Sequence, residues 1–349
     1  MVETEVQPPE NPYRGTLPLL SLGVFLVMLA SIWWGAVPIS LDTMLSATRK
    51  FLTGDDGLTL DERIFLTIRL PRAVLAIVVG GALAVGGALM QGLFRNPIVE
   101  PGLIGTSAGA AFGAALYFVL GATFKVNAGA WTLPIVASLG AALSTWLVYW
   151  LSGANVTGRS SVVSLLLTGI AINALFLSGV GFLSYLARDP QARSITFWNL
   201  GTLAGSSWHA VMVVAPVTIL GIAFALREAR GLNALMLGEE EAGYLGVDVH
   251  ALKTRVLIVN VIIVAVATAF TGVIAFVGLI VPHMLRMWRG ADARFLLLGG
   301  GLLGGILLGL ADLTARMILA PAELPIGIVT SVVGVPIFIF LLRRTEVFS

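Results

Sequence analysis

Long apolar stretches separated by short polar segments run along almost the whole chain. A helix that crosses the hydrocarbon core of a membrane needs about 20 mostly apolar residues. Ten stretches approach or exceed that length, and they are residues 17–37, 70–93, 102–120, 131–151, 162–186, 208–226, 251–271, 274–288, 295–318 and 326–342. The pattern predicts an all-α fold, a polytopic transmembrane helical bundle of ten spans that forms a single domain over residues 1–349.

The distribution of Lys and Arg among the predicted loops indicates the orientation. An even number of spans places both termini on one side, and cationic loops concentrate on the cytoplasmic side. With both termini cytoplasmic, 12 of the 21 Lys and Arg residues lie inside and 9 outside. Residues 1–16 are then a cytoplasmic tail, because their acidic composition is unlike the basic start of a signal peptide. The outer cations that exceed what topology needs are Arg69, Arg72, Arg188, Arg193 and Arg316.

Composition supports a membrane protein and excludes several chemistries. Charged residues make up 11% of the chain, against about 25% in soluble proteins. There is no cysteine, which excludes disulfides, thiolate metal sites and a cysteine nucleophile. The net charge of +2 suggests no nucleic-acid partner. The motifs of phosphate-binding loops, zinc proteases and serine hydrolases are missing, and the three histidines lie in different segments, so we expect neither an enzyme nor a metal site.

A short acidic segment, residues 238–248, follows the sixth predicted span. It reads Gly-Glu-Glu-Glu-Ala-Gly-Tyr-Leu-Gly-Val-Asp. The segment is too polar for the bilayer and too short for a domain, and the predicted topology places it in the cytoplasm. It is either an ordinary loop or a handle by which a soluble partner holds the membrane protein, and its spacing leaves both interpretations open.

Two further segments are unusual for membrane depth. Around Pro97 and Pro101 the backbone must be irregular, which a membrane tolerates only inside protein or beside water. A tight turn at the inner mouth of a pathway fits that requirement. Asp312 is the only carboxylate that the span assignment places deep in the membrane, and the spacing to Arg316 favours an ion pair on one helix over a functional charge. Glycines repeat four apart from residue 300 to residue 309 and predict close helix contact, within or between subunits.

Taken together, these segments resemble the permease subunits of iron-chelate and vitamin B12 ABC importers, the FecCD-like type II importers. The matching motifs are Arg69-Leu-Pro-Arg72, Arg95-Asn-Pro97, Glu100-Pro-Gly102, Gly105-x-Ser-x-Gly-Ala110, residues 238–247, Gly272-x-Ile-x-Phe-Val-Gly-Leu-Ile-x-Pro-His-x-x-Arg286, Ala311-Asp-x-x-Ala-Arg316 and Glu323-Leu-Pro-Ile-Gly327. They extend over roughly residues 60–344.

The resemblance implies a homodimer in the bacterial inner membrane, with two ATP-binding subunits inside and a periplasmic binding protein outside. ATP and Mg²⁺ would bind to the partner subunit, and this chain would bind no cofactor. The implied ATPase-coupling residues are Gly238, Glu239, Glu241, Ala242, Leu245 and Gly246. The implied docking residues for the binding protein are Arg69, Arg72 and Arg316. Looser matches place Asn96, Ile98, Ser160 and Ser161 near the cytoplasmic gate.

The segment 186–205 is most similar to haem-importing members. Haem offers an apolar ring and two propionates, and Arg188 and Arg193 suit carboxylates, with Tyr185, Phe197 or Trp198 beside the ring. The alternative is that the two arginines cap a short outer helix. A ferric siderophore or cobalamin remains an alternative substrate, and a secondary transporter is the alternative class.

Overall fold

The computed structural model describes residue 13 and residues 15–35, 37–124, 129–153 and 162–346, and every regular element in these ranges is a helix. In chain order they are α1 (Thr16–Trp33), α2 (Leu41–Thr53), α3 (Leu60–Ile64), the π-helix η1 (Phe65–Arg69), α4 (Leu70–Phe94), α5 (Thr106–Phe124), α6 (Thr132–Leu151), α8 (Val162–Leu186), α9 (Asp189–Asn199), α10 (Trp208–Leu235), α11 (Glu239–Tyr244), α12 (Val249–Thr271), α13 (Val277–Arg289), α14 (Ala293–Met317) and α15 (Ile326–Glu346).

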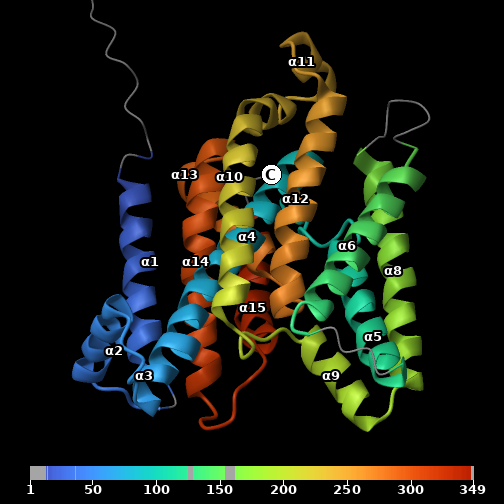
Figure 1. The fold of residues 1–349 in the computed structure, drawn as a ribbon. Coiled ribbons are helices and arrows are strands. Elements are labelled where there is room, and N and C mark those ends of the chain that lie inside the picture. Colours follow the sequence, from blue (N-terminus) through green and yellow to red (C-terminus); the bar gives the residue numbers. More distant parts are fainter. Residues whose placement is uncertain (1–12, 14, 36, 125–128, 154–161, 347–349) are drawn as a thin grey trace, which may run out of the picture.

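Each of the ten predicted spans coincides with a helix. Seven helical segments of the described chain are long and apolar enough to cross a membrane, while α5, α13 and α15 are shorter or less apolar. The helical class is therefore confirmed, whereas the count of ten spans and the cytoplasmic termini stay predictions. The beginning of α1 and the short α11 lie at one end of the bundle, and α2, α3 and α9 lie at the other (Figure 1). We call these the α11 end and the α9 end.

The long helix α4 is the centre of the bundle, and almost all of its residues are buried. Its closest neighbour is α14, on which it packs through glycines. A Cβ atom on Gly80 would collide with the carbonyl of Gly304, and a Cβ on Gly304 would collide with the carbonyl of Gly80. Backbone therefore touches backbone at this crossing, which only small residues permit. The glycine spacing in residues 300–309 predicts close helix contact, and the structure confirms it within the chain.

The segment between α1 and α4 differs from its prediction. Residues 38–69 lie between the first two predicted spans, where no helix is predicted, but most of them form α2, α3 and η1. The Ser40 hydroxyl accepts the Thr43 N–H at the start of α2, and Gly54 ends the helix in the left-handed region. These are ordinary helix start and stop signals. A search for stretches of about 20 mostly apolar residues misses α2, because the helix is amphipathic and only 13 residues long.

Candidate transport site

The acidic segment forms the tip of the α11 end. It comprises the short helix α11 and the turn that follows it. The segment joins the two long helices α10 and α12 and extends beyond the rest of the bundle (Figure 1). Ala242 is fully buried against the ends of these helices, whereas Tyr244 and Leu245 are 89% and 63% exposed. Gly238 begins the turn at φ +145°, a conformation that side chains other than glycine rarely adopt. The tip is thus anchored on one side and presents an aromatic and an aliphatic side chain outward.

Of the acidic side chains in this segment, Glu239 has a partner within the chain. Its carboxylate lies 2.6 Å from the Nζ atom of Lys253 on α12, and the lysine side chain is nearly buried. Glu241 is exposed, and its carboxylate lies beside Gly238. The three glutamates of the first turn are favourable at the positive end of a helix dipole. Glu239 therefore holds α11 on α12, while Glu241 stays available for a partner.

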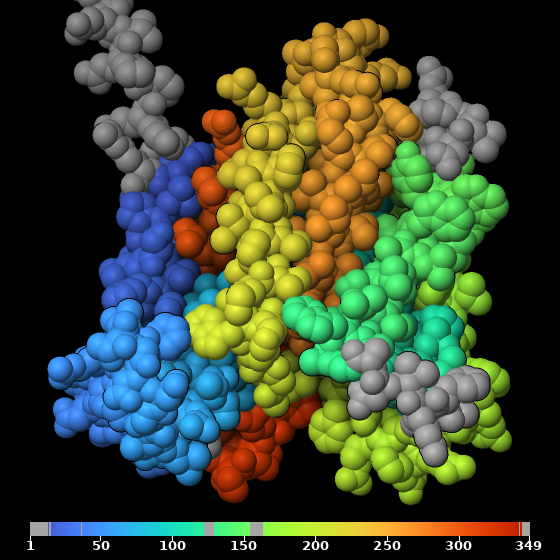
Figure 2. Space-filling model, viewed as in Figure 1, coloured from blue at the N-terminus to red at the C-terminus, as the bar shows by residue number. Residues whose placement is uncertain are grey.

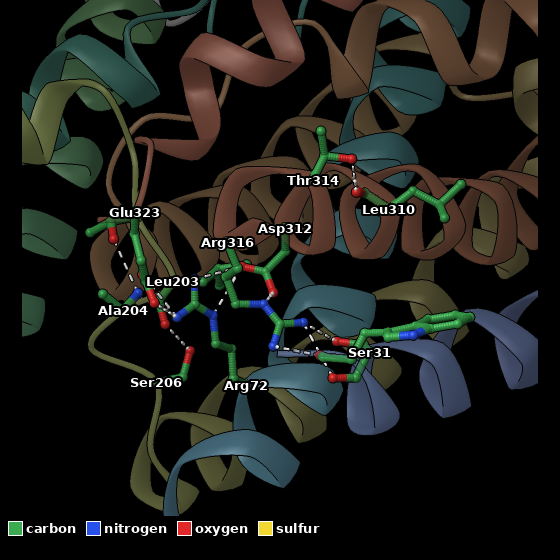
Figure 3. Close-up of polar contacts among 12 residues, drawn as sticks. Ser31, Arg72, Leu203, Ala204, Ser206, Leu310, Asp312, Thr314, Arg316 and Glu323 are labelled. Atoms are coloured by element: carbon green, nitrogen blue, oxygen red, sulfur yellow. Dashed lines mark hydrogen bonds and ion pairs between the residues drawn. The ribbon is translucent and has the colours of Figure 1, made fainter. Parts of the chain in front are cut away.

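Two of the outer arginines, Arg72 and Arg316, form a buried cluster with Asp312 at the α9 end (Figure 3). The guanidinium of Arg72 lies 2.9 Å from Oδ1 of Asp312, and that of Arg316 lies 3.0 Å from Oδ2 of the same carboxylate. Arg72 also donates two hydrogen bonds to the carboxylate of Glu323, at 2.8 and 3.0 Å. Asp312 is fully buried, and Arg72 and Arg316 are 6% and 5% exposed. The cluster ties α4 to α14 and to the loop that follows α14.

Arg316 and a third outer arginine, Arg69, also hold the end of α1. Arg316 donates to the carbonyl and hydroxyl of Ser31, and Arg69 donates to the carbonyls of Ile32 and Val37. Carbonyls at a helix C-terminus lack partners within the helix, so cations are favourable there. These contacts fix α1 to η1 and α14 at the α9 end.

This arrangement changes the interpretation of three of the five outer cations. They look surplus in the sequence, but each of Arg69, Arg72 and Arg316 is buried and bonded within the chain. The predicted ion pair between Asp312 and Arg316 is confirmed. Docking of a binding protein on the three arginines stays a prediction, and Arg72 is already paired with the carboxylate of Glu323, whose side chain is 37% exposed.

The turn between α4 and α5 packs inside the bundle. Pro101 fits against Gly86 of α4 and Gly278 of α13, and its carbonyl accepts a hydrogen bond from Asn260 of α12. Next to it, the carboxylate of Glu100 accepts the N–H of Phe276 at 3.3 Å. Glu100 thus lies beside the interior of the bundle. The span assignment does not count this carboxylate beside Asp312, because a turn that folds back between helices brings its own side chain inward. Whether Asp312 is the only carboxylate deep in the membrane stays a prediction.

The predicted gate residues are placed only in part. Asn96 is partly buried, and its side-chain oxygen accepts the N–H of Ile98, which is half exposed. Arg95 ends α4 with a positive φ of 48°. Ser160 and Ser161 lie outside the described residues. The geometry supports a tight turn at this position and leaves the gate assignment a prediction.

The residues proposed to meet substrate surround α9. Tyr185, near the end of α8, is 86% exposed, and the exposed Arg188 directly precedes α9. Arg193 lies on α9 and lines an open hollow together with Asp189 and Thr196. Their short helix is confirmed, and the N–H of Arg188 donates to the side chain of Gln191 in its first turn.

The aromatic residues around α9 have unequal roles. Phe197 is half exposed, but Trp198 is buried in the cluster that holds α9 against α5. Among the described residues, no three acidic or histidine side chains gather in a way that could hold a metal ion. Exposed cationic and aromatic groups at the α9 end could contact an amphipathic anion, and Trp198 is part of the structure that supports them.

Sequence reasoning misses Lys253, Ser31 and the role of Glu323. Glu323 belongs to a motif that carries the resemblance, so its acidity next to a predicted outer surface is a usable signal. Ser31 and Lys253 have no such signal. Their contacts join residues that are 285 and 14 positions apart and depend on how the helices pack.

The sequence is similar to a family of transport proteins and to individual transporter subunits. The model of the FecCD transport family matches residues 23–344. The hemin transport system permease protein HmuU of Yersinia pestis is 40% identical over 327 residues, which are 94% of this chain and 96% of that protein. The cobalamin import system permease protein BtuC of Halobacterium salinarum is 41% identical over 80% of this chain and 73% of its own length. The Fe(3+) dicitrate transport system permease protein FecC of Escherichia coli is 33% identical over 94% and 98%.

A solved structure has the same fold. It is an inward-facing conformation of a transporter described as metal-chelate type, and it superposes with a TM-score of 0.82 at 30% identity, covering 95% of this chain and all of that one. A family match over most of the chain and a shared architecture lead to the same assignment. The chain belongs to the FecCD transport family and is the permease type of subunit of an ABC transporter.

Proposed function

We propose that the chain is the permease of an ATP-driven importer that moves haem from the periplasm to the cytoplasm across the bacterial inner membrane. The observation that carries the proposal is the α11 tip, which is fixed to two long helices and presents exposed apolar groups beyond the bundle. Apolar side chains outside the bilayer favour a protein partner. An ATP-binding subunit docked there would supply the energy, and ATP and Mg²⁺ would be bound by that subunit.

The remaining partners follow from the family. ABC permeases of this type work with ATP-binding subunits and a substrate-binding protein, commonly as dimers. We place a second copy of the chain beside the first and the periplasmic binding protein at the α9 end. Closure of the two ATP-binding subunits would displace both α11 tips, and α10 and α12 would transmit that displacement to the spans, so that the pathway opens alternately to each side.

Haem is favoured by two observations. The hemin permease is among the relatives with the highest identity and matches nearly the whole chain. In addition, α9 and its surroundings combine two exposed arginines, Arg188 and Arg193, with exposed aromatic rings. Guanidinium groups bind carboxylates in a bidentate way, which suits the two propionates. A ferric siderophore or cobalamin is the alternative cargo, because relatives with those printed names share similar identity.

The decisive experiment is reconstitution in vesicles with an ATP-binding subunit and a haem-binding protein from the same organism. We expect ATP-dependent haem uptake and haem-dependent stimulation of ATP hydrolysis. Replacing Arg188 and Arg193 by Gln should lower haem uptake while leaving basal ATP hydrolysis unchanged. Uptake of a ferric siderophore or cobalamin in place of haem would contradict the haem assignment and leave the importer assignment intact.

The coupling role of α11 has its own test. Replacing Glu239 and Glu241 by Arg should uncouple ATP hydrolysis from uptake while the dimer still assembles. A Glu239→Gln variant separates the contributions, because it removes only the ion pair with Lys253. Normal uptake by the double variant would contradict the coupling assignment.

The docking proposal for Arg69, Arg72 and Arg316 needs a control for folding. Their replacement by Glu should weaken binding of the periplasmic protein, but buried cations that hold three helices also stabilise the fold. Affinity for the binding protein should therefore be compared with the thermal unfolding midpoint of each variant. A variant that keeps its stability and its affinity contradicts docking at that arginine.

A secondary transporter is the weaker alternative. Such a transporter needs a titratable or ion-binding group in the membrane. Asp312 is held between two guanidinium groups, and the carboxylate of Glu100 is bonded to the N–H of Phe276.

A further inference from the structure

The exposed surface of α2 carries a stripe of leucines with charged residues beside it. Leu41, Leu45 and Leu52 are 52%, 61% and 78% exposed, and their spacing of four and seven residues places them in one stripe. Arg49 and Asp42 are exposed as well. At 100° of rotation per residue, Arg49 and Asp42 project roughly 60° and 80° away from the centre of the leucine stripe. Such an arrangement is typical of a helix that lies between an apolar and an aqueous phase.

The third face of α2 is fixed to the protein. Met44 and Ala47 are 6% and 0% exposed and pack in a small cluster with Phe65 and Leu66 of η1. The leucine stripe therefore points away from the bundle. Figure 2 shows the segment as a ledge that projects beside α1 at the α9 end.

Polar contacts prevent α2 from rolling over to bury its leucines. The side chain of Glu62 on α3 is nearly buried and accepts hydrogen bonds from Ser46 and Lys50 of α2, at 2.5 and 2.9 Å. It also accepts the N–H of Thr59 at 2.7 Å, which closes the capping box of α3. Burial of a paired carboxylate between two helices fixes their relative rotation.

The depth of α2 relative to a membrane follows from α1. The 18 residues of α1 span about 27 Å, close to the roughly 30 Å of a hydrocarbon core. Most of its surface is exposed and apolar, so α1 faces lipid. The helix ends at Trp33 and Trp34, which are 51% and 55% exposed, and tryptophans concentrate at the boundary between acyl chains and headgroups. Arg69 holds the carbonyl of Val37 close to this end, so α2 begins at the same boundary.

From these observations we propose that α2 is an interfacial anchor, whose Leu41, Leu45 and Leu52 stripe lies in the acyl–headgroup boundary of the phospholipid leaflet at the α9 end. The stripe continues the lipid-facing surface of α1, and the charged residues of α2 face water. A soluble partner protein is the competing occupant. It is disfavoured because the stripe adjoins the tryptophan level of a lipid-facing helix.

The absence of cysteine makes the test direct. Single substitutions Leu45→Cys and Leu52→Cys in the full chain are labelled with an environment-sensitive fluorophore, with Asp42→Cys and Thr53→Cys as matched controls on the same exposed helix. The labelled proteins are reconstituted in phosphatidylcholine vesicles whose acyl chains carry bromine either near the headgroup or near the methyl end. Each labelled variant is first checked for the thermal unfolding midpoint of the unlabelled chain.

At positions 45 and 52 we expect blue-shifted emission and quenching that is stronger with bromine near the headgroup than near the methyl end. At positions 42 and 53 we expect emission typical of water, quenching by aqueous iodide and little effect of bromine. Equal iodide quenching and no bromine effect at all four positions would overturn the proposal and assign the stripe to water or to a soluble partner. The result does not depend on which substrate the chain transports.

Discussion

The two ends of the molecule use charge in opposite ways. At the α9 end, Arg72 and Arg316 are buried, share the carboxylate of Asp312 and join three helices. At the α11 end, the acidic segment has one ion pair, and its aromatic and aliphatic side chains point outward. In the sequence both regions are short clusters of charge between apolar stretches. The difference teaches that charge next to a span marks either an internal clamp or a contact surface, and that only burial and bonding distinguish the two.

The strongest test of the comparison is removal of the shared charge by Asp312→Asn. It leaves two buried guanidinium groups without their common partner, so we expect a loss of stability of about 3–5 kcal/mol. The thermal unfolding midpoint of the purified protein measures it. Glu228→Gln is the matched control, because Glu228 pairs with the exposed Arg255 and should contribute about 0–1 kcal/mol. Equal midpoints for the two variants would mean that the cluster is no clamp.

At the other end the expected effect is on binding. Tyr244→Ala combined with Leu245→Ala should weaken association with the ATP-binding subunit by about 2 kcal/mol, roughly thirtyfold, without lowering the unfolding midpoint. Tyr185→Ala is the control, since Tyr185 is similarly exposed near the α9 end. A titration of the reconstituted permease with the subunit measures the affinity. An unchanged affinity in the double variant would show that Tyr244 and Leu245 do not form a contact surface for the ATP-binding subunit.

The shape of the tip depends on Gly238. A Gly238→Ala change forces a side chain into φ +145° and towards Glu241, which should cost about 1–3 kcal/mol locally. We expect faster amide hydrogen exchange in α11 and normal exchange in α4. Gly243→Ala is the matched control, because a Cβ at Gly243 meets no neighbouring atom. Equal exchange rates in both variants would show that the turn is not strained.

The smallest effect should come from Glu323→Gln. Glu323 binds the outer side of Arg72 but is 37% exposed, so its loss should change stability by about 0–1 kcal/mol. The same unfolding measurement applies. A loss as large as that of Asp312→Asn would extend the clamp to the loop after α14.

Much of the fold can be predicted from the sequence, because a membrane imposes a simple rule on length and polarity. All ten predicted spans are helices, and the glycine repeat in α14 does mark a close helix contact. The amphipathic α2 is not predicted by this rule, because the helix is short and carries polar as well as apolar residues. The pairing of Arg72 with Asp312 also escapes, because the residues are 240 positions apart and their meeting depends on how α4 and α14 cross.

The site could be predicted less completely. The pair formed by Asp312 and Arg316 follows from local spacing, and the helix after Arg188 is one of two open interpretations. The position of the acidic segment outside the bundle follows from its polarity, whereas its role as a handle stays a prediction. Burial of Arg69 does not, because its partners are backbone carbonyls at the end of α1 and no sequence pattern marks a carbonyl. Glu100 is likewise hidden from span counting, since the turn that carries it folds back between helices.

The backbone contact between Gly80 and Gly304 has a mechanical consequence. Because no side chains separate the two backbones, α4 and α14 cannot adjust their contact by sliding or by changing side-chain conformations. The ion pair between Arg72 and Asp312 joins the same two helices a second time at the α9 end. We therefore expect α4 and α14 to behave as one rigid unit. If a passage opens and closes, we expect the movement in less buried helices such as α8 and not in this pair.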